Sequence, residues 1–428
     1  MLIDTGIPAE ERTERYDNSK FACATLSNGI PVWIQEPEFV PSHEGVLLAF
    51  LNNVGAICDP IGLEGCAHFF EHIPGRGTEN HPFAGSLKNA CDKIGASYNW
   101  STSERATKYV YGGPLWHFHA LADLLAETTL RPLITPEGVE VELGVILEEL
   151  TRAKSGSGFS KTPRIREHLF RGLRYHRALG TEESIKRIDA SALRAFHESY
   201  YHAGNIALVI GGAFAELPRN EVIDQLEKSF GSVAHSLPAP GVRFAPCALS
   251  SSERHEFAGR NYRRSSFTRM ALFPFTSFRD YIALDLLRDV TRRALAKDLR
   301  DKRGIIYETD VLSVAAVGDA VLVNFDVLTD PANFSILKER FVESLSGVSN
   351  EDIRERLRGL QLTRPNGFAH PISACKDLPH EIRSLGTYRS TGEWRRTRDT
   401  LTYAELHEAK EKLLAVPWLT LEFDATRD

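Results

Sequence analysis

The segment from His68 to His72 holds residue types that can bind a metal ion and move a proton. Its string is His-x-x-Glu-His, with His68, Glu71 and His72 at the fixed positions. In a helix, residues four apart lie on one face, so the two imidazoles can chelate one zinc ion. Glu71 lies on the edge of that face, where its carboxylate can act on a water molecule without binding the metal. The segment therefore predicts a zinc site with its own general base.

A catalytic zinc ion usually takes three protein ligands, so a third ligand must come from another segment. Residues 141–150 are predicted to be helical, and Glu142 and Glu149 lie two turns apart on one face of that helix. Val145 and Ile146 lie between them on or near this face, which makes the face apolar. A buried carboxylate needs a partner, and zinc is a suitable one.

The chain at this point resembles the pitrilysin family of zinc peptidases, which includes insulin-degrading enzyme and the mitochondrial processing peptidase. In that family a ligand Glu, in a context like Val-Ile-Leu-x-Glu, follows the inverted motif by roughly 70 to 80 residues. Glu149 follows His72 by 77 residues and ends the string Val-Ile-Leu-Glu-Glu. The resemblance implies that Glu149 is the third zinc ligand and that Glu142 supports the site. The alternative for Glu142 is an ordinary buried carboxylate paired with a base.

Further segments continue the resemblance in the first half: Gly-Ala-Ser-Tyr-Asn at 95–99, Leu-Gly-Thr-Glu-Glu-Ser-Ile at 179–185 and Tyr-His-Ala-Gly-Asn at 201–205. In the second half, residues 299–307 are similar to the family's Leu-Arg-x-x-x-Gly-x-x-Tyr segment. The resemblance implies that Arg300 and Tyr307 bind the substrate backbone near the scissile bond. Two positions depart from the family. Trp100 stands where the family usually has Ala, and Asp-Val-Thr-Arg-Arg-Ala-Leu at 289–295 stands where the family usually has a Gly-rich turn followed by Ser-Arg-Leu.

Length and composition indicate a globular protein with two domains. The chain has 428 residues, too many for one ordinary core, and is 42% hydrophobic and 25% charged. The stretch after Gly231, with Pro238, Pro240 and Gly241, predicts a linker. We therefore expect a zinc-binding domain at 1–232, a linker at 233–243 and a second domain at 244–428 that carries the Arg/Tyr segment. The predicted order of strands and helices recurs after the linker. The resemblance implies an α+β fold in which each domain is an antiparallel β-sheet backed by helices, and together they form a half-shell.

Charge and hydropathy argue against two classes of partner. The formal net charge is −6, and no basic block is suited to nucleic-acid phosphates. No uninterrupted apolar run is long enough to cross a membrane. The N-terminal residues are acidic and lack the apolar core of a signal peptide, so we expect a cytoplasmic protein without a visible signal or transit peptide.

These observations favour a zinc-dependent endopeptidase that cleaves unfolded or extended peptides, including leader or processing peptides, inside a closed chamber. Glu71 would take a proton from water and pass it to the leaving amine. Tyr307 and Arg300 would assist the oxyanion, and Asn99 would help fix a substrate strand added alongside residues 97–102. The resemblance also implies pairing of two half-shells, as a homodimer or as a heterodimer with a related subunit. The alternative is a non-catalytic subunit that scaffolds or presents peptides.

Other residues near the motif have weaker claims to chemistry. His117 and His119 resemble a second ligand pair, but their place at a predicted helix start favours capping or surface exposure. His81, Tyr109 and Tyr111 are further candidates for lining the cleft.

Overall fold

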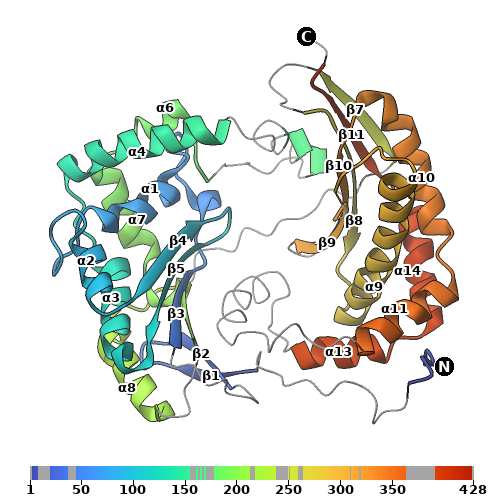
Figure 1. The fold of residues 1–428 in the computed structure, drawn as a ribbon. Coiled ribbons are helices and arrows are strands. Elements are labelled where there is room, and N and C mark those ends of the chain that lie inside the picture. The colour runs from blue at the N-terminus through green and yellow to red at the C-terminus, as the bar shows by residue number, and fades with distance from the viewer. Residues whose placement is uncertain are drawn as a thin grey trace.

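The computed structural model describes residues 2–7, 20–36, 45–154, 161, 164–165, 168–169, 178–212, 217–237, 249, 251–258, 264–308, 310–317, 320–362 and 391–426. Within these residues the strands form two separate sheets, each backed by helices (Figure 1). The chain is therefore described below as a first half and a second half. Most of the predicted linker, residues 238–243, lies outside the described part.

The first half contains a six-stranded sheet. Its strands, in spatial order, are β1 (Phe21–Thr25), β2 (Pro31–Gln35), β6 (Ile206–Gly212), β3 (Gly45–Asn52), β5 (Thr107–Pro114) and β4 (Ser97–Thr102). Its helices are α1 (Cys66–His72), α2 (Ser86–Lys93), α3 (Phe118–Leu130), α4 (Pro136–Lys154), α6 (Glu182–Ile185), α7 (Ala190–Tyr200) and α8 (Arg219–Phe230). Short 3-10 turns extend α1, through Ile73–Gly75, and precede α3, at Leu115–His117.

The second half contains a five-stranded sheet. Its strands, in spatial order, are β7 (Glu253–Ala258), β11 (Leu419–Asp424), β8 (Ser266–Pro274), β10 (Ala320–Leu328) and β9 (Leu312–Val317). Its helices are α9 (Phe278–Leu295), α10 (Phe334–Ser346), α11 (Asn350–Leu362), α13 (Thr391–Asp399) and α14 (Tyr403–Ala415). A π-helical segment at Ala296–Lys302 continues α9.

The two sheets share one topology. The order β2-β6-β3-β5-β4 in the first half matches β7-β11-β8-β10-β9 in the second, and the corresponding pairs run in the same relative directions. The prediction of two similar α+β halves is confirmed. The sheets are mixed and not purely antiparallel, because β2 pairs with β6, and β7 with β11, in parallel. A parallel pair needs a long crossover connection, and each of these pairs is separated by most of its own half.

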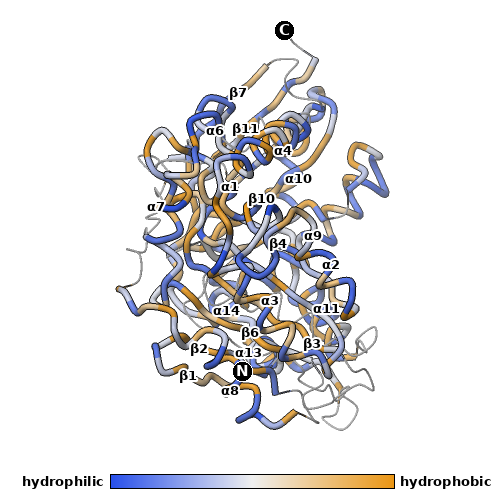
Figure 2. The backbone as a smooth tube through the Cα atoms, turned by 90° about the vertical axis from the view of Figure 1, so that its left-hand side faces the viewer, coloured by the Kyte–Doolittle hydropathy of each residue, from blue (hydrophilic) through white to orange (hydrophobic). Residues whose placement is uncertain are grey.

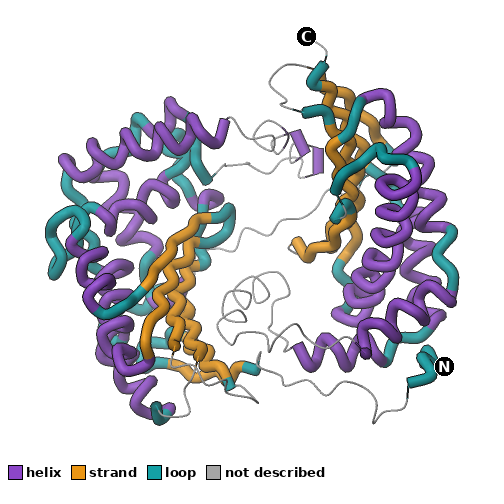
Figure 3. Tube along the Cα trace, in the orientation of Figure 1, coloured by secondary structure: helices purple, strands orange, loops and turns teal. Residues whose placement is uncertain are grey.

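The sheets lie on the inner sides of the two halves and the helices lie on the outer sides (Figures 1 and 3). Separate apolar clusters fill the space between each sheet and its helices. The N-terminal residues cross between the halves, since Ile3 is buried in the second cluster and Leu2 makes a β-bridge to Thr402.

The helices are amphipathic, as helices with one buried face should be. Along the tube in Figure 2, hydrophobic and hydrophilic residues alternate within the helices that flank the sheets. Among the described residues, no helix is both long and apolar enough to cross a membrane.

Candidate metal centre

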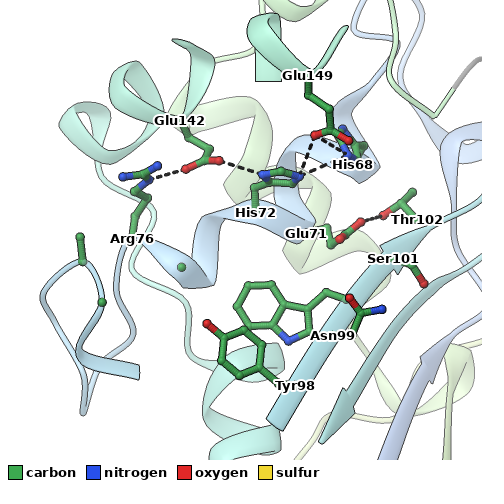
Figure 4. Close-up of a pocket in the computed structure, with 14 residues that line it drawn as sticks. His68, Glu71, His72, Arg76, Tyr98, Asn99, Ser101, Thr102, Glu142 and Glu149 are labelled. Carbon is green, nitrogen blue, oxygen red and sulfur yellow. Dashed lines mark hydrogen bonds and ion pairs between the residues drawn. The ribbon is translucent and has the colours of Figure 1, made fainter. Parts of the chain in front are cut away.

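Three side chains from α1 and α4 bring their ligand atoms together. The Nε2 atoms of His68 and His72 lie 3.2 Å apart, and Glu149 Oε2 lies 3.7 Å and 3.6 Å from them, respectively. All three ligand atoms fall within 4.8 Å of one another. Figure 4 shows both imidazoles pointing toward the Glu149 carboxylate. Two imidazoles and one carboxylate are a donor set that suits zinc and leaves a fourth position open.

The charge states of the two histidines follow from their surroundings. Burial, and then the neighbouring His72, lower the pKa of His68 to about 3, so His68 is neutral at pH 7. Burial also lowers the pKa of His72, but the hydrogen bond to Glu142 and the nearby carboxylates outweigh it and raise the pKa overall. In the described part of the chain His68 Nδ1 is buried without a hydrogen-bond partner. The other ring nitrogen, Nε2, points toward His72 and Glu149 and is the atom placed to bind a metal ion. His68 therefore fits a metal ion, which takes the imidazole in its neutral form.

Glu142 fixes the orientation of His72. One carboxylate oxygen of Glu142 lies 2.8 Å from His72 Nδ1, and the other accepts a hydrogen bond from Arg76 Nε. Burial raises the pKa of Glu142, but the hydrogen bonds from His72 and Arg76 have the larger effect. The pKa therefore falls below its ordinary value, and Glu142 is ionised at pH 7. An ionised partner at Nδ1 holds the proton there and leaves the Nε2 lone pair for the metal. Glu142 thus pairs with the base Arg76 and also contacts the candidate ligand His72.

Glu71 lies beside the cluster without belonging to it. Its side chain is buried, and Thr102 Oγ1 donates a 2.6 Å hydrogen bond to Oε2 (Figure 4). Burial raises the pKa of Glu71, and the Thr102 hydrogen bond offsets part of the increase. A carboxylate with a raised pKa holds a proton more readily than an ordinary Glu does, which is what proton transfer near neutral pH requires.

Backbone contacts far apart in the sequence hold the start of α1. The carboxylate of Asp59 accepts hydrogen bonds from the backbone N–H groups of Gly65, at 2.7 Å, and Ala67, at 2.8 Å. Gly180 has φ +64°, and a Cβ there would lie 2.0 Å from the carbonyl oxygen of Glu64. Ser184 Oγ donates to that same oxygen at 2.6 Å. The family-like segment 179–185 therefore packs directly on the turn from which the metal-binding helix begins.

A cleft of about 650 Å³ opens beside the cluster, and residues of α1, α4 and β4 line it. Among the described strands, β4 pairs only with β5, so the other edge of β4 is unpaired. Residues of β4 line the cleft. Asn99 lines the cleft from β4. Trp100, which replaces the family's Ala, also lines it and stacks on Tyr98 at a ring-centroid distance of 5.1 Å. The cleft thus has an aromatic wall next to an open strand edge.

Arg300 and Tyr307 lie elsewhere, since neither lines this cleft. Both are exposed, Tyr307 by 81%, and the Arg300 guanidinium lies 5.6 Å from the Tyr307 ring centroid. Gly304 between them has φ +65°, a conformation that favours glycine. The unusual residues 289–295 belong to α9, where Asp289 pairs with Arg292 at 3.0 Å and also with Arg356.

The weaker candidates do not line the cleft. His119 pairs with Glu221 at 3.2 Å, and both side chains are about half exposed. Tyr109 and Tyr111 are fully buried and hydrogen-bond to Tyr201 and Thr128, so they lie beneath the cleft and do not line it. His81 does not line it either.

Sequence reasoning missed three residues that hold the site: Asp59, Arg76 and Thr102. Their types are ordinary, and their partners in the site become apparent only once the chain is folded. The one available signal was position, because Arg76 follows His72 by four residues and so continues the metal-binding face of a helix.

Comparison with known proteins agrees with this geometry. A family model described as insulinase, peptidase family M16, matches residues 41–181, and one described as the peptidase M16 inactive domain matches residues 187–357. The insulin-degrading enzyme homolog of Dictyostelium discoideum is 28% identical over 214 residues, covering 50% of this chain and 21% of the relative. The mitochondrial-processing peptidase subunit beta of Caenorhabditis elegans is 26% identical over 231 residues, covering 54% and 48%. These matches span less than half the length of either relative.

A solved structure covers nearly the whole chain. The crystal structure of a protease from Helicobacter pylori superimposes with a TM-score of 0.78 at 18% identity, covering 95% of this chain and 99% of that one. This likeness shows a shared fold. Taken with the two family models, it shows that the chain belongs to the peptidase M16 family, which includes pitrilysin and insulinase.

Proposed function

We propose that this chain is a zinc-dependent endopeptidase that hydrolyses peptides in an extended conformation. One observation carries the proposal: the buried carboxylate of Glu71 lines the same cleft as the converging ligand atoms of His68, His72 and Glu149. A purely structural zinc site has four protein ligands and no need of a free carboxylate. The intact set argues against a subunit that has lost its catalytic residues.

His68, His72 and Glu149 would hold the zinc ion. When bound, zinc polarises a carbonyl group and lowers the pKa of water. Glu71 is positioned to take a proton from the attacking water at its carboxylate and to give that proton to the leaving amine. Thr102 keeps the Glu71 carboxylate in one orientation during both transfers.

The substrate class follows from the open edge of β4. An extended peptide can add to such an edge through main-chain hydrogen bonds, which makes recognition largely independent of side chains. Asn99 on β4 is proposed to help fix this added strand. The edge runs along the cleft that holds the three ligand atoms, so a bound peptide would pass the metal.

We further propose that Arg300 and Tyr307 act at the substrate main chain across the space between two half-shells. Their exposure and their distance from the cleft suit a role in which a second chain, or a movement of the halves, brings them to a site. The match to a protein named as a subunit supports pairing, as a homodimer or with a related chain. The proposed domain limits remain 1–232 and 244–428. A cytoplasmic location stays a prediction.

The test combines metal content with peptide cleavage in the full chain. Zinc is removed with a chelator and restored, and cleavage of unfolded peptides of different lengths is followed by mass spectrometry. We expect cleavage to stop without zinc and to return with it, while His68→Ala stays inactive. His119→Ala, which breaks a surface histidine–carboxylate pair, is the matched control and should cleave like the wild type.

Zinc-loaded chain that cleaves no peptide, alone or with a related subunit, would favour the non-catalytic alternative. Cleavage that persists in His68→Ala would place the activity at another site.

A further inference from the structure

Residues that follow α4 in the chain dock on the second half. The described ones are Lys161, Arg164, Ile165, His168 and Leu169, here called the crossing segment. The Lys161 ammonium is buried and lies 2.9 Å from Asp326 on β10. Leu169 is fully buried in an apolar cluster with residues of β8, β10 and β11. This cluster lies on the face of the second sheet that turns away from its own helices, since the opposite residues of β8 and β10 pack against those helices.

On that same face, three metal-binding side chains meet. Glu253 and His255 are two residues apart on β7, so they project from one face of the strand. His168 of the crossing segment lies against them, and the ligand atoms of the three residues fall within 4.8 Å of one another. His255 Nε2 lies 3.2 Å from Glu253 Oε2, and the rings of His168 and His255 have centroids 3.9 Å apart. All three side chains are half-buried.

The cluster of His168, Glu253 and His255 differs from an ordinary surface ion pair. The pair of His119 and Glu221 has two members with 55% and 45% of their side chains exposed, whereas His255 and Glu253 have 34% and 21% exposed. Among the residues that the structure describes, a third donor from a distant segment joins only the pair of His255 and Glu253. Two imidazoles and a carboxylate repeat the donor set of the first cluster. Imidazole and carboxylate together favour zinc and neighbouring divalent transition metals over calcium or magnesium.

We propose that His168, Glu253 and His255 form a second site for a divalent transition-metal ion such as zinc, which ties the crossing segment to β7. An imidazole binds a metal in the plane of its ring, and the two rings are stacked at an interplanar angle of 27°. One ring therefore turns about its Cβ–Cγ bond as the ion binds. The crossing segment also contacts β7 beside these residues, since the Arg164 guanidinium lies 5.6 Å from the ring centroid of Phe257.

The site would matter for the geometry of the first one. The crossing segment follows α4, and α4 carries both Glu142 and Glu149. An ion that fixes this segment to the second sheet restricts how far α4 can move relative to the second half.

The experiment isolates the second site by removing the first. Full-length His68→Ala/His72→Ala chain is stripped with a chelator, reloaded with Zn²⁺ and passed through gel filtration, and its zinc content is measured. We expect one zinc ion per chain. Adding His255→Ala should remove it, whereas adding His119→Ala should leave it in place. Co²⁺ in the double variant should give the visible absorption of a site with nitrogen and oxygen ligands, and this band should vanish with His255→Ala.

Glu253→Gln is a second variant in case His255→Ala does not fold, because the amide keeps the shape of the carboxylate and removes only its charge. Loss of a supporting contact at a metal site costs roughly 10- to 100-fold in affinity. Glu253→Gln should lower the affinity for Zn²⁺ by at least this factor, because it alters a ligand. The proposal is overturned if the double variant elutes without zinc, or if its zinc survives both His255→Ala and Glu253→Gln. Because no activity is measured, the result is independent of whether the first site is a peptidase.

Discussion

At the scale of single residues, the metal centre depends on a chain of contacts that starts at Arg76. Arg76 holds Glu142, Glu142 holds the Nδ1 side of His72, and His72 directs Nε2 toward His68 and Glu149. Each link is a charge-assisted hydrogen bond or a ligand contact in a partly buried place, where such contacts are stronger than in water.

Arg76→Ala should therefore weaken zinc binding without removing a ligand. We expect a loss of about 10- to 100-fold in affinity, as for other residues that orient metal ligands, measured by competition with a chromophoric chelator. Arg131→Ala is the matched control, because it breaks a similar 2.7 Å pair with Glu127 away from the site. Equal zinc affinity in the two variants would show that Arg76 does not orient the ligands.

The two glutamates of α4 should separate by the same measurement. Glu149→Gln replaces an anionic ligand by a neutral amide and should reduce zinc affinity more than Glu142→Gln does. For Glu142→Gln we expect a loss of about 10- to 100-fold, as for other residues that orient a metal ligand. The opposite ranking would mean that the roles have been exchanged.

The convergence of His68 and His72 was predictable from the sequence, because they lie one turn apart on a helix. Glu149 was selected by the resemblance to the pitrilysin family, since its own helix also carries Glu142, Glu148 and other carboxylates. Asp59 and Thr102 were not predictable, since they reach α1 through contacts made only after the chain has folded.

At the scale of elements, the position of α1 depends on backbone packing at its N-terminus. Gly65 and Gly180 both have positive φ and lie so close that a Cβ on either one would press on the other's segment. The side chain of Asp59 satisfies two N–H groups at this end of the helix.

Gly180→Ala should consequently disturb α1. Its φ of +64° is strained for alanine, and the added Cβ would overlap the carbonyl of Glu64. We expect a loss of at least about 1–2 kcal/mol in the free energy of unfolding, with weaker zinc binding. Thermal denaturation of the zinc-free and zinc-loaded chains would measure both.

Gly144→Ala is the control for this substitution. Gly144 lies within α4 in open space, so alanine there should stabilise the helix by about 0.5–1 kcal/mol. Similar behaviour of the two variants would contradict the packing role of Gly180.

Strands differ in how readily the sequence predicts them. β3 and β6 are nearly continuous apolar runs and are almost wholly buried, which makes them readable. β1 and β7 lie at sheet edges and have only five and six residues, too few for a clear pattern. The parallel pairings of β2 with β6 and β7 with β11 could not be read, because pairing direction depends on residues far apart in the chain.

At the scale of the whole molecule, two sheets of one topology face each other, and the chain crosses between their halves more than once. Ile3 packs in the second core, and the crossing segment docks on the second sheet. The short apolar stretch at the N-terminus gave no sign of this contact. Such crossings connect the two halves through packed contacts, which bears on whether Arg300 and Tyr307 serve a site in the same chain.

Tyr307→Phe tests how the second half contributes. Removing one hydrogen-bond donor at a developing oxyanion should lower turnover by about 10- to 1000-fold, with zinc content unchanged. In a homodimer, mixing His68→Ala chains with Tyr307→Phe chains should restore part of the activity by reuniting one intact site. No rescue in verified mixed dimers would mean that one chain, or a different protein, completes the site.

The central claim is that Glu71 moves protons beside a zinc ion that it does not bind. The most direct measurement is zinc content and peptide cleavage on the same preparation of Glu71→Gln, because the amide keeps the shape of the carboxylate and removes the base. We predict zinc content equal to that of the wild type and cleavage reduced by at least about 100-fold. Wild-type cleavage in this variant, or loss of its zinc, would contradict the account.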